Sequence, residues 1–573
     1  MGPFVRGFAL AATLVTIVAC SMMNPSKPAR PARAADMATE CEKMVPPLET
    51  EFPANFDFPQ NGTKIKNWLI PGMGGRTRLH AYCVFAGLQQ DAPNFPVWRM
   101  WKTASQALPL QYNTWRHLES LKPAQPGAEE ASQPLTINES RAQASGKLGA
   151  IRNLGPIYGV HDEIVKNPFY QKCLMPIPKL KDSDKQLYKL KDGQRFQSNG
   201  DIMIATVSYS PPAYDYIVKN RLYNAETLDP QLPAQPQSPP NTNFASMPDN
   251  SIVLKAMYWP VAGGSGDLTA LPIWDWNANP PGSSSDGQYA GYEMKQFWRR
   301  AVAIAPFPVE PKRSTAAVVF LHGVLDAKGD KLGPNLYGAP IVGIDRFYSL
   351  SSRGLDALGL SDCDRALLDA SAYWTYNRRF MPGDSLALIA MHIMTKEQPS
   401  WTFQSAFWHP DALKCHNSDK SGIQNRLCSH QPDLVPGGDT TWKNYMMVTT
   451  YGATQQEDKT INPNIYRPAS TVGPVWPVAY NPYIELAATH PITTNCINCH
   501  SRAAWPPDNP KQKPHDGRFS AYLQDSPANP NVLETFTTST GPFKGLLMLD
   551  NMWAVSDRAG YPATESQGAH PTQ

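Results

Sequence analysis

The fold class of this chain is decided by Ser385-Leu386-Ala387-Leu388-Ile389-Ala390-Met391-His392-Ile393-Met394-Thr395. This run is almost wholly apolar and lies between Gly383-Asp384 and a Pro-containing turn, which is typical of a β-strand. Similar short runs, rich in β-branched or aromatic residues and separated by Gly, Pro, Asp or Asn, recur at residues 251–260, 299–305, 316–322, 401–408 and 444–451. The series predicts a largely antiparallel sheet or sandwich.

The chain before residue 250 is predicted to mix helices and strands. Apolar residues recur at helical spacing in residues 78–89, and residues 97–108 are a second helix candidate. Residues 202–210 alternate like a strand, and residues 213–223 have one apolar helical face. Residues 227–248 are dense in Pro, Gln, Ser and Asn, which predicts an exposed loop at a domain boundary. We therefore expect an α+β, predominantly β fold with short N-terminal helices.

A second motif is Cys496-Ile497-Asn498-Cys499-His500. Two cysteines three positions apart can place both thiols on one side of a helical turn, where they add to the vinyl groups of a haem, and the following histidine can bind the iron. With 9 cysteines and 12 histidines in 573 residues, chance gives this pattern on the order of 0.003 times per chain. The motif predicts one covalent haem c in a C-terminal haem-binding segment, attached through Cys496 and Cys499, with His500 as the proximal iron ligand.

The same motif has a second interpretation, as a disulfide or half of a zinc site with a bystander histidine. A structural zinc site needs four ligands, and the chain contains no other Cys-x-x-Cys pair. The haem interpretation is therefore favoured.

The chemistry of such a haem depends on the group opposite His500. A methionine or a second histidine there restricts the iron to electron transfer, whereas an open position lets it bind peroxide, CO, NO or reduced nitrogen compounds. The candidates for this distal position are Met548, Met552 and His392. Each also has an ordinary interpretation, since methionine fills irregular gaps in cores and a histidine in an apolar strand is often a hydrogen-bonded core residue.

Other side chains also have two interpretations. His80 is predicted to be a core or capping residue rather than a ligand, and Lys396 and Glu397 could form a partly buried ion pair with each other. The aromatic residues of the 401–408 run build either core or the wall of a cofactor site: Trp401, Phe403, Phe407 and Trp408. His409, His416 and His430, near Cys415 and Cys428, are spaced irregularly, which favours a surface loop over a metal site.

The N-terminus predicts export. Residues 8–19 form an apolar run typical of a secretion signal, and it is shorter than the roughly 20 residues that span a bilayer. Its end, Ile17-Val18-Ala19-Cys20, resembles a bacterial lipoprotein signal, which implies lipidation of Cys20 and stable anchoring by several acyl chains. Ser21 stands where inner-membrane lipoproteins commonly carry aspartate, which favours the outer membrane. The alternative is an ordinary signal peptide cleaved near Ala34-Ala35, with Cys20 discarded.

Cysteine usage agrees with an oxidising compartment. Without Cys20 and the motif pair, an even number remains, which suggests three disulfides among Cys41, Cys83, Cys173, Cys363, Cys415 and Cys428. Cys415 with Cys428 is the best local pair, and the pairing of the other four stays open.

These features predict an order of regions along the chain. They are a lipoprotein signal peptide (1–20), a tether (21–40), a mixed α/β N-terminal region (41–248), a β-rich domain (249–480) and a c-type haem-binding region packed on that domain (481–573).

The chain resembles a family of large, exported, single-haem bacterial proteins of the cytochrome c type. The similar stretches are residues 383–397, 401–408 and 481–485, together with the motif and residues 501–504. The resemblance implies a haem and an exported location, and no particular substrate.

A weaker similarity is to the β-rich cytochromes of the hydroxylamine-oxidising and c-prime-beta types, whose haem motif is also near the C-terminus and whose distal site is open. Asp550-Asn551-Met552-Trp553 is the match to their Asp-plus-aromatic segment. The 50-residue separation between His500 and Asp550 departs from their pattern.

The expected function is one-electron transfer with a periplasmic redox partner, by a protein held at the outer membrane through its lipid anchor. A net charge of +3 gives no argument for nucleic acid, and no nucleophile elbow, dinucleotide fingerprint or phosphate loop is present. One alternative is a haem enzyme of oxidase or peroxidase type, or a gas or small-molecule sensor, with an open distal site. Another is a ligand-binding lipoprotein that uses Trp259, Trp274, Trp276 and Trp298.

Overall fold

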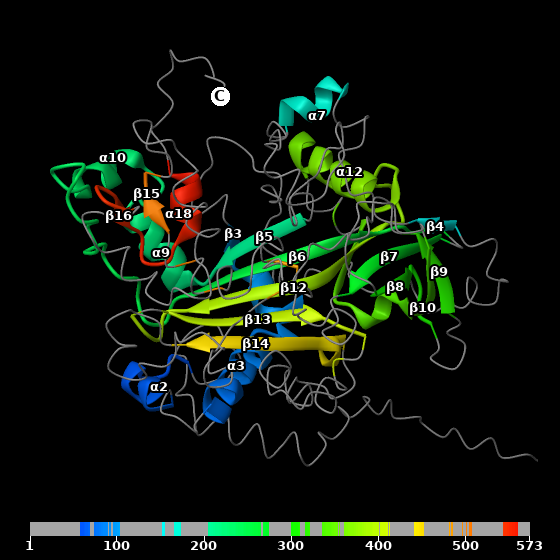
Figure 1. The fold of residues 1–573 in the computed structure, drawn as a ribbon, viewed down its shortest axis with the longest axis horizontal. Helices are drawn as coiled ribbons and strands as arrows, with labels where there is room; N and C mark the ends of the chain where they lie inside the picture. Colours follow the sequence, from blue (N-terminus) through cyan, green and yellow to red (C-terminus); the bar gives the residue numbers. More distant parts are fainter. Residues whose placement is uncertain are drawn as a thin grey trace, which may run out of the picture.

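The structure is a computed structural model of the chain. It describes residues 58–68, 74–89, 91–92, 95–103, 152–154, 166–173, 204–264, 267–273, 300–309, 316–320, 335–352, 355, 360–399, 401–410, 412, 441–451, 481, 483–484, 496, 500, 503–506 and 543–559. This part is a mixed α/β fold with largely antiparallel sheets and few short helices (Figure 1). The coarse fold prediction is confirmed.

A seven-stranded sheet lies at the centre, in the order β14-β13-β12-β6-β5-β3, with β11 also paired to β12. All of its strand pairs are antiparallel. Its strands are β3 (Lys102–Thr103), β5 (Ile204–Tyr209), β6 (Ile252–Val261), β11 (Ser349–Ser351), β12 (Ser385–Thr395), β13 (Thr402–Trp408) and β14 (Tyr445–Tyr451). The run 385–395 is therefore the central strand β12, as its apolar character predicts.

A second sheet has five strands in the order β4-β7-β8-β10-β9, and its strand β7 follows β6 along the chain. It is mixed, because β10 runs parallel to β8, and β4 runs parallel to β7. Its strands are β4 (Arg152–Leu154), β7 (Asp267–Ile273), β8 (Arg300–Ala305), β9 (Ala316–Phe320) and β10 (Asn335–Gly343). Two further two-stranded pairs are β1 (Asp91–Ala92) with β2 (Phe95–Pro96) and β15 (Ala504–Trp505) with β16 (Leu547–Met548).

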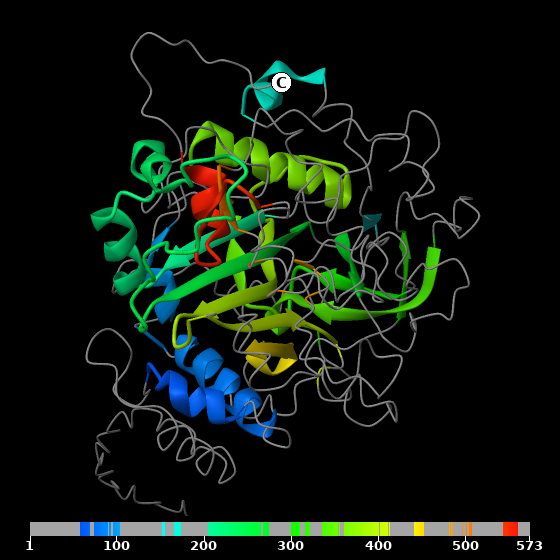
Figure 2. The same ribbon diagram turned by 60° about the vertical axis from the view of Figure 1, so that its left-hand side comes forward.

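Helices cover both faces of the central sheet (Figures 1 and 2). On one face lie α2 (Gly62–Trp68) and α3 (Gly74–Leu88), and on the other lie α12 (Asp362–Tyr376) and α18 (Trp553–Arg558). The remaining helices are α7 (Pro168–Cys173), α9 (Pro211–Lys219) and α10 (Ala225–Leu228), and the 3-10 turns are η1 (Val97–Met100), η2 (Asp229–Gln231), η4 (Ile344–Arg346) and η7 (Thr441–Asn444).

Two helix predictions are confirmed and one is wrong. The 78–89 segment is α3, and 213–223 overlaps α9. Residues 97–108 do not form one helix, because the short turn η1 ends at Met100 and the chain then pairs as β3 with β5.

Helix α12 begins with a capping box. Ser361 accepts from the amide of Asp364, whose carboxylate in turn accepts from the amide of Ser361. The helix ends at Asn377, which adopts the left-handed conformation (φ 62°) that asparagine tolerates. Its buried face packs on β6, where the rings of Trp374 and Trp259 lie 5.1 Å apart in an edge contact.

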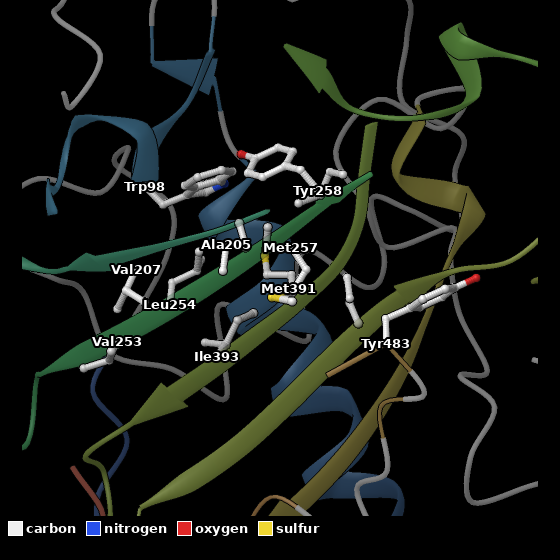
Figure 3. Close-up of a cluster of buried hydrophobic side chains, with 14 of the residues drawn as sticks. Trp98, Ala205, Val207, Val253, Leu254, Met257, Tyr258, Met391, Ile393 and Tyr483 are labelled. Atoms are coloured by element: carbon white, nitrogen blue, oxygen red, sulfur yellow. The ribbon is translucent and has the colours of Figure 1, made fainter. Parts of the chain in front are cut away.

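The core surrounds the middle strands, whose side chains point to both covered faces (Figure 3). Every residue of β5 and β13, and all of β12 except Ser385, is buried. Because both faces are buried, these strands are continuous apolar runs, and their sequence alternates weakly. The 401–408 aromatics belong to this core, as one of their two interpretations predicts.

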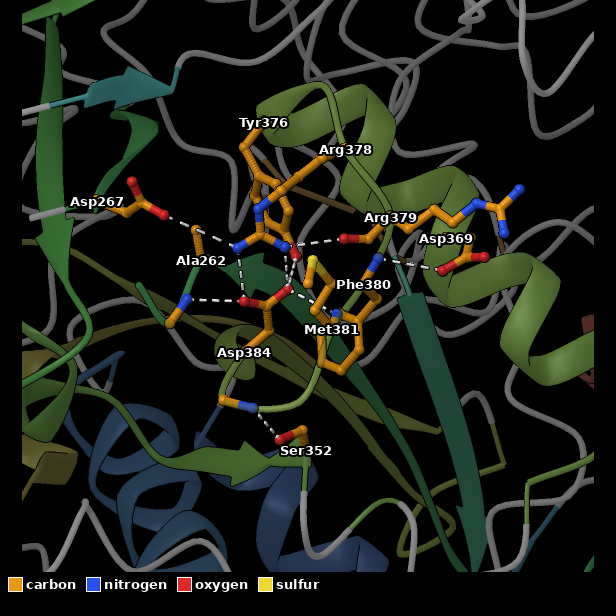
Figure 4. Close-up of polar contacts among 12 residues, drawn as sticks. Ala262, Asp267, Ser352, Asp369, Tyr376, Arg378, Arg379, Phe380, Met381 and Asp384 are labelled. Carbon is orange, nitrogen blue, oxygen red and sulfur yellow. Dashed lines mark hydrogen bonds and ion pairs between the residues drawn. The ribbon is translucent and has the colours of Figure 1, made fainter. Parts of the chain in front are cut away.

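A buried carboxylate fixes the start of β12 (Figure 4). Asp384 accepts hydrogen bonds from the Tyr376 hydroxyl (2.7 Å), the Gly263 amide (2.7 Å) and the Met381 amide (2.9 Å). The Arg378 guanidinium adds two more, at 2.7 and 2.8 Å. This residue therefore ties together the end of α12, the β6–β7 turn and β12.

The central sheet takes strands from both sides of residue 248. β3 and β5 precede it, and the other strands follow it. The 227–248 segment, predicted to be a boundary loop, holds the end of α10 and the turn η2, and its Asn241 bridges to Leu547. Residues on both sides of residue 248 thus share one sheet and one hydrophobic core.

Cys83 and Cys363 each take part in a disulfide. The pair Cys415 and Cys428 lies outside the described residues, as do the predicted signal segment, the tether and Cys20. Among the described helices, none has the length and apolar character needed to cross a membrane.

Candidate functional site

β12 directs His392 to the face of the sheet opposite α3. The preceding residue, Met391, accepts a hydrogen bond at its sulfur from Gln89 Nε2, at 3.5 Å, just beyond the end of α3. Successive strand residues point to opposite faces. His392 therefore points to the face that the C-terminal segment covers.

On that face the structure brings His392 together with two residues of the Cys-x-x-Cys-His motif. The Cys496 sulfur lies 3.6 Å from His392 Nδ1, and Cys496 is buried and is not part of a disulfide. The rings of His392 and His500 lie 5.1 Å apart between centroids, with an angle of 26° between their planes. Cys499 lies outside the described residues.

Phe403 completes the cluster from the neighbouring strand β13. Its ring centroid lies 5.1 Å from that of His500 and 5.8 Å from that of His392. Of the aromatic residues in the 401–408 run, Phe403 is thus the one that lies against both histidines, as a core residue that is also a wall of the site.

His500 is held in a defined orientation and tautomer. Its Nδ1 lies 2.7 Å from the backbone carbonyl oxygen of Asn551, and a carbonyl can only accept, so Nδ1 carries the proton. The other nitrogen, Nε2, then keeps its lone pair and can bind a metal. Burial lowers the pKa of His500 to about 4, so the ring is neutral at neutral pH, as a ligand must be.

The carbonyl that orients His500 belongs to an unusual turn. Asp550 and Asn551 both have positive φ, 46° and 65°, immediately before α18. Asparagine and aspartate are the side-chain-bearing residues that tolerate this conformation best. The turn lies within the Asp550–Trp553 segment that the resemblance to β-rich cytochromes singles out, and it lies beside the histidine of the motif.

His392 is a buried side chain with one nitrogen that lacks a partner. Only 6% of the residue is exposed, and Nε2 has no hydrogen-bond partner within the described part of the chain. Burial lowers the pKa of His392 well below its ordinary value, and His500 and Lys255 lower it further, so the ring is neutral. Orphaned buried polar atoms are rare in native proteins and need an explanation, such as a missing ligand.

The two methionine candidates lie elsewhere in the C-terminal segment. Met552 is buried in the main core at the N-cap of α18, directly after Asn551. Met548 is on β16 and packs against a separate small cluster of Ala504, Phe543 and Leu546. Of the three predicted distal residues, His392 is the one found stacked on His500.

The predicted ion pair between Lys396 and Glu397 is wrong, because these neighbours bind partners on opposite faces of the sheet. Lys396 Nζ contacts Asp550 Oδ1 at 2.7 Å on the His392 face. Glu397 Oε1 lies 3.1 Å from His80 Nε2 on the α3 face. His80 is fully buried, as predicted for a core residue, and its Nδ1 is 2.9 Å from the Tyr451 hydroxyl.

The other sequence candidates lie away from this cluster or outside the described residues. His409 is buried, and its amide donates to the Asn444 carbonyl, whereas His416 and His430 are outside the described residues. Trp259 packs in the core on Trp374, and Trp274, Trp276 and Trp298 are also outside. Within the described ranges, no group of three or more His, Cys, Asp and Glu side chains is arranged to hold a metal ion.

The residues missed by sequence analysis are Asn551, Asp550 as the partner of Lys396, and Lys255. Asn551 contributes only a backbone carbonyl, which no side-chain pattern reveals. Two sequence signals point to this residue: its place in the Asp550–Trp553 segment that the resemblance singles out, and the Asp-Asn pair, which is typical of a left-handed turn. Lys255 stands opposite His392 in the β6–β12 register, which only the strand pairing reveals.

No family model, curated protein or solved structure is significantly similar to this chain. Its function therefore has to be inferred from the site.

Proposed function

We propose that this chain is an exported c-type cytochrome that carries one covalent haem and exchanges single electrons with a partner protein outside the cytoplasm. The observation that carries the proposal is the 2.7 Å hydrogen bond from His500 Nδ1 to the Asn551 carbonyl. Metal-binding histidines are almost always oriented by such a bond from the second ring nitrogen, which also raises the basicity of the first.

The chemistry of the neighbouring groups fits a haem. Cys496 and Cys499 would hold the porphyrin through thioethers, and His500 Nε2 would bind the iron. When bound, the haem supplies a reversible one-electron couple.

The Nε2 atom of His392, which has no hydrogen-bond partner among the described residues, supports electron transfer over ligand chemistry. It is neutral, buried and on the central strand, and a second imidazole on the iron would leave no position for an exogenous molecule. His392 is therefore the proposed distal ligand, ahead of Met552 and Met548. We also propose that the C-terminal haem-binding segment packs on a predominantly β scaffold, that Cys20 anchors the protein in the outer membrane, and that its redox partner is periplasmic.

A haem enzyme or sensor with an open distal site is the second candidate. The stacking of His392 on His500 favours it, because a ring that stays beside the iron without binding it can donate a hydrogen bond to a bound small molecule. The two functions differ in the coordination of the iron, so one spectrum separates them.

The test is the visible spectrum of the full-length exported protein, oxidised and reduced, with and without CO. Wild type is compared with His392→Ala, Met552→Ala and Met548→Ala, and covalent haem is measured on a denaturing gel. We expect a low-spin spectrum indifferent to CO that becomes high-spin and CO-sensitive in His392→Ala alone. A CO-sensitive wild type would replace electron transfer with the open-site function. Absence of covalent haem from the wild-type protein would overturn both.

A further inference from the structure

A buried ion pair joins the end of β12 to the turn that orients His500. Lys396 is 3% exposed, and its Nζ lies 2.7 Å from Asp550 Oδ1 and 2.6 Å from the Pro399 carbonyl. The same ammonium lies 5.2 Å from the centre of the Trp401 ring, within the range of a cation–π contact. The lysine is thus fixed by the β12–β13 connection, which belongs to the rigid central sheet.

Asp550 is held from two directions. Its Oδ1 accepts from Lys396, and its Oδ2 accepts a longer hydrogen bond, 3.4 Å, from the Met247 amide. The side chain of Asp550 is 13% exposed, so water competes little with these contacts. A buried charge without its partner is costly, so separating Lys396 from Asp550 is unfavourable.

The backbone next to this pair is strained. Asp550 and Asn551 are consecutive non-glycine residues at positive φ, a conformation that persists only where the surroundings impose it. The Asn551 carbonyl accepts from His500 Nδ1 at 2.7 Å and from the Trp553 amide at 3.2 Å. If the turn relaxed, this carbonyl would rotate away from His500.

We infer that the Lys396–Asp550 pair is a positioning pair for His500: it holds the strained turn so that the Asn551 carbonyl accepts the Nδ1 proton. This inference rests on the proposed function. The hydrogen bond makes His500 a stronger electron donor to iron, which stabilises the ferric state and lowers the reduction potential. The pair therefore sets the potential through the turn, although neither side chain touches His500.

Each variant changes the potential through charge and through the turn. Removing the Asp550 charge raises the potential, since a carboxylate stabilises ferric iron, and removing the Lys396 charge lowers it. Loosening the turn raises it in both cases. The double variant removes both charges and leaves the effect of the turn, so it separates positioning from simple electrostatics.

The experiment measures the midpoint potential and the solvent-exchange rate of the His500 Nδ1 proton, by NMR of the reduced protein. The variants are Asp550→Asn, Lys396→Met and the double variant. We expect Asp550→Asn to raise the midpoint potential more than the other two variants do. Each tenfold loss in the equilibrium preference for ferric over ferrous iron corresponds to a rise of about 59 mV. We expect the double variant to lie between wild type and Asp550→Asn, and the Nδ1 proton to exchange at least about tenfold faster in all three.

The matched control is Asp369→Asn on α12. Asp369 is also a carboxylate whose pKa is raised by burial, and it accepts two hydrogen bonds, from the Tyr170 hydroxyl (2.9 Å) and the Phe380 amide (3.1 Å). This variant should lower the melting temperature and leave the potential and the Nδ1 exchange rate unchanged.

A double variant with the wild-type potential and exchange rate would overturn the inference, and so would equal changes in Asp369→Asn. If a single variant does not fold, the double variant, which buries no unpaired charge, still decides. Failure of the proposed function is a separate result, because the wild-type protein would then carry no covalent haem.

Discussion

Asp384→Ala should be among the most destabilising substitutions in the described part of the chain. The substitution leaves the hydroxyl of Tyr376 and the amide of Gly263 without their acceptor, and it removes both bonds to Arg378. A buried donor that loses its partner costs about 1–3 kcal/mol, and breaking a buried charge pair costs about 3–5 kcal/mol in all. The Arg378 side chain is 28% exposed and can turn to water, so its share is the smaller part.

We therefore expect Asp384→Ala to lose about 3–5 kcal/mol, a large part of the roughly 5–15 kcal/mol that separates folded from unfolded proteins. Urea denaturation followed by tryptophan fluorescence measures the loss. Asp215→Ala, at an exposed position of α9, is the control and should stay within about 0.5 kcal/mol of wild type.

A second variant tests the cause. If the loss comes from orphaned donors, adding Tyr376→Phe to Asp384→Ala should recover about 1–3 kcal/mol, because the stranded hydroxyl is gone. A loss below about 1 kcal/mol in Asp384→Ala, or no recovery in the double variant, would refute the reasoning.

Three further predictions follow from other parts of the molecule. Gly263→Ala should lower stability by at least about 1–3 kcal/mol in thermal denaturation, because a Cβ there would lie 1.8 Å from the Gly383 carbonyl oxygen. Unchanged stability would mean that the turns holding Gly263 and Gly383 can move apart without cost. Burial raises the pKa of Asp369 above its ordinary 3.8, so the folded chain binds that proton more tightly than the unfolded chain does. The contribution of Asp369 to stability should therefore fall as pH rises from 3.8 through the folded pKa. Urea denaturation of wild type and Asp369→Asn at several pH values measures it, as the unfolding free energy of wild type relative to that of the variant. If the wild type became more stable relative to the variant as pH rose, this prediction would be wrong. Glu397→Ala should cost about 3–5 kcal/mol, because it leaves the buried ring of His80 and the backbone amide of Gln60 without this hydrogen-bond partner. Hydrogen exchange should then accelerate in α3. Unchanged exchange in α3 would show that this network does not attach the helix to the sheet.

The sequence predicts the strands of the central sheet well because burial on both faces makes them continuous apolar runs. β12, β13 and β14 differ from their predicted bounds by no more than a residue at either end. β7 and β10 are missed, since Pro272 lies within the first, and Gly338 and Pro340 lie within the second. α12 is missed although Ser361 and Asp364 form a readable capping box, because its many small residues give a weak apolar stripe.

For the site, the sequence predicts what side-chain chemistry can reveal. The motif and His392 are found from their residue types and setting, and the structure brings Cys496, His500 and His392 together. The pair of Lys396 with Asp550 joins residues 154 positions apart, and no local pattern encodes such a contact. Pairing Lys396 with Glu397 fails for a geometric reason, since neighbours at the end of a strand point to opposite faces.

The two walls of the candidate site differ in how firmly they are attached. β12 is hydrogen-bonded to β6 and β13 along most of its length, so its amides should exchange with deuterium only when the whole sheet unfolds. Among the described residues, the only strands of the opposite wall are the two-residue β15 and β16, and side-chain contacts such as the Lys396–Asp550 pair and that of His500 with Asn551 hold the rest. A sub-global opening can thus lift this wall from an intact sheet. The amides of β15, β16 and α18 should then exchange with deuterium faster than those of β12, and their exchange rate would report the frequency of that opening.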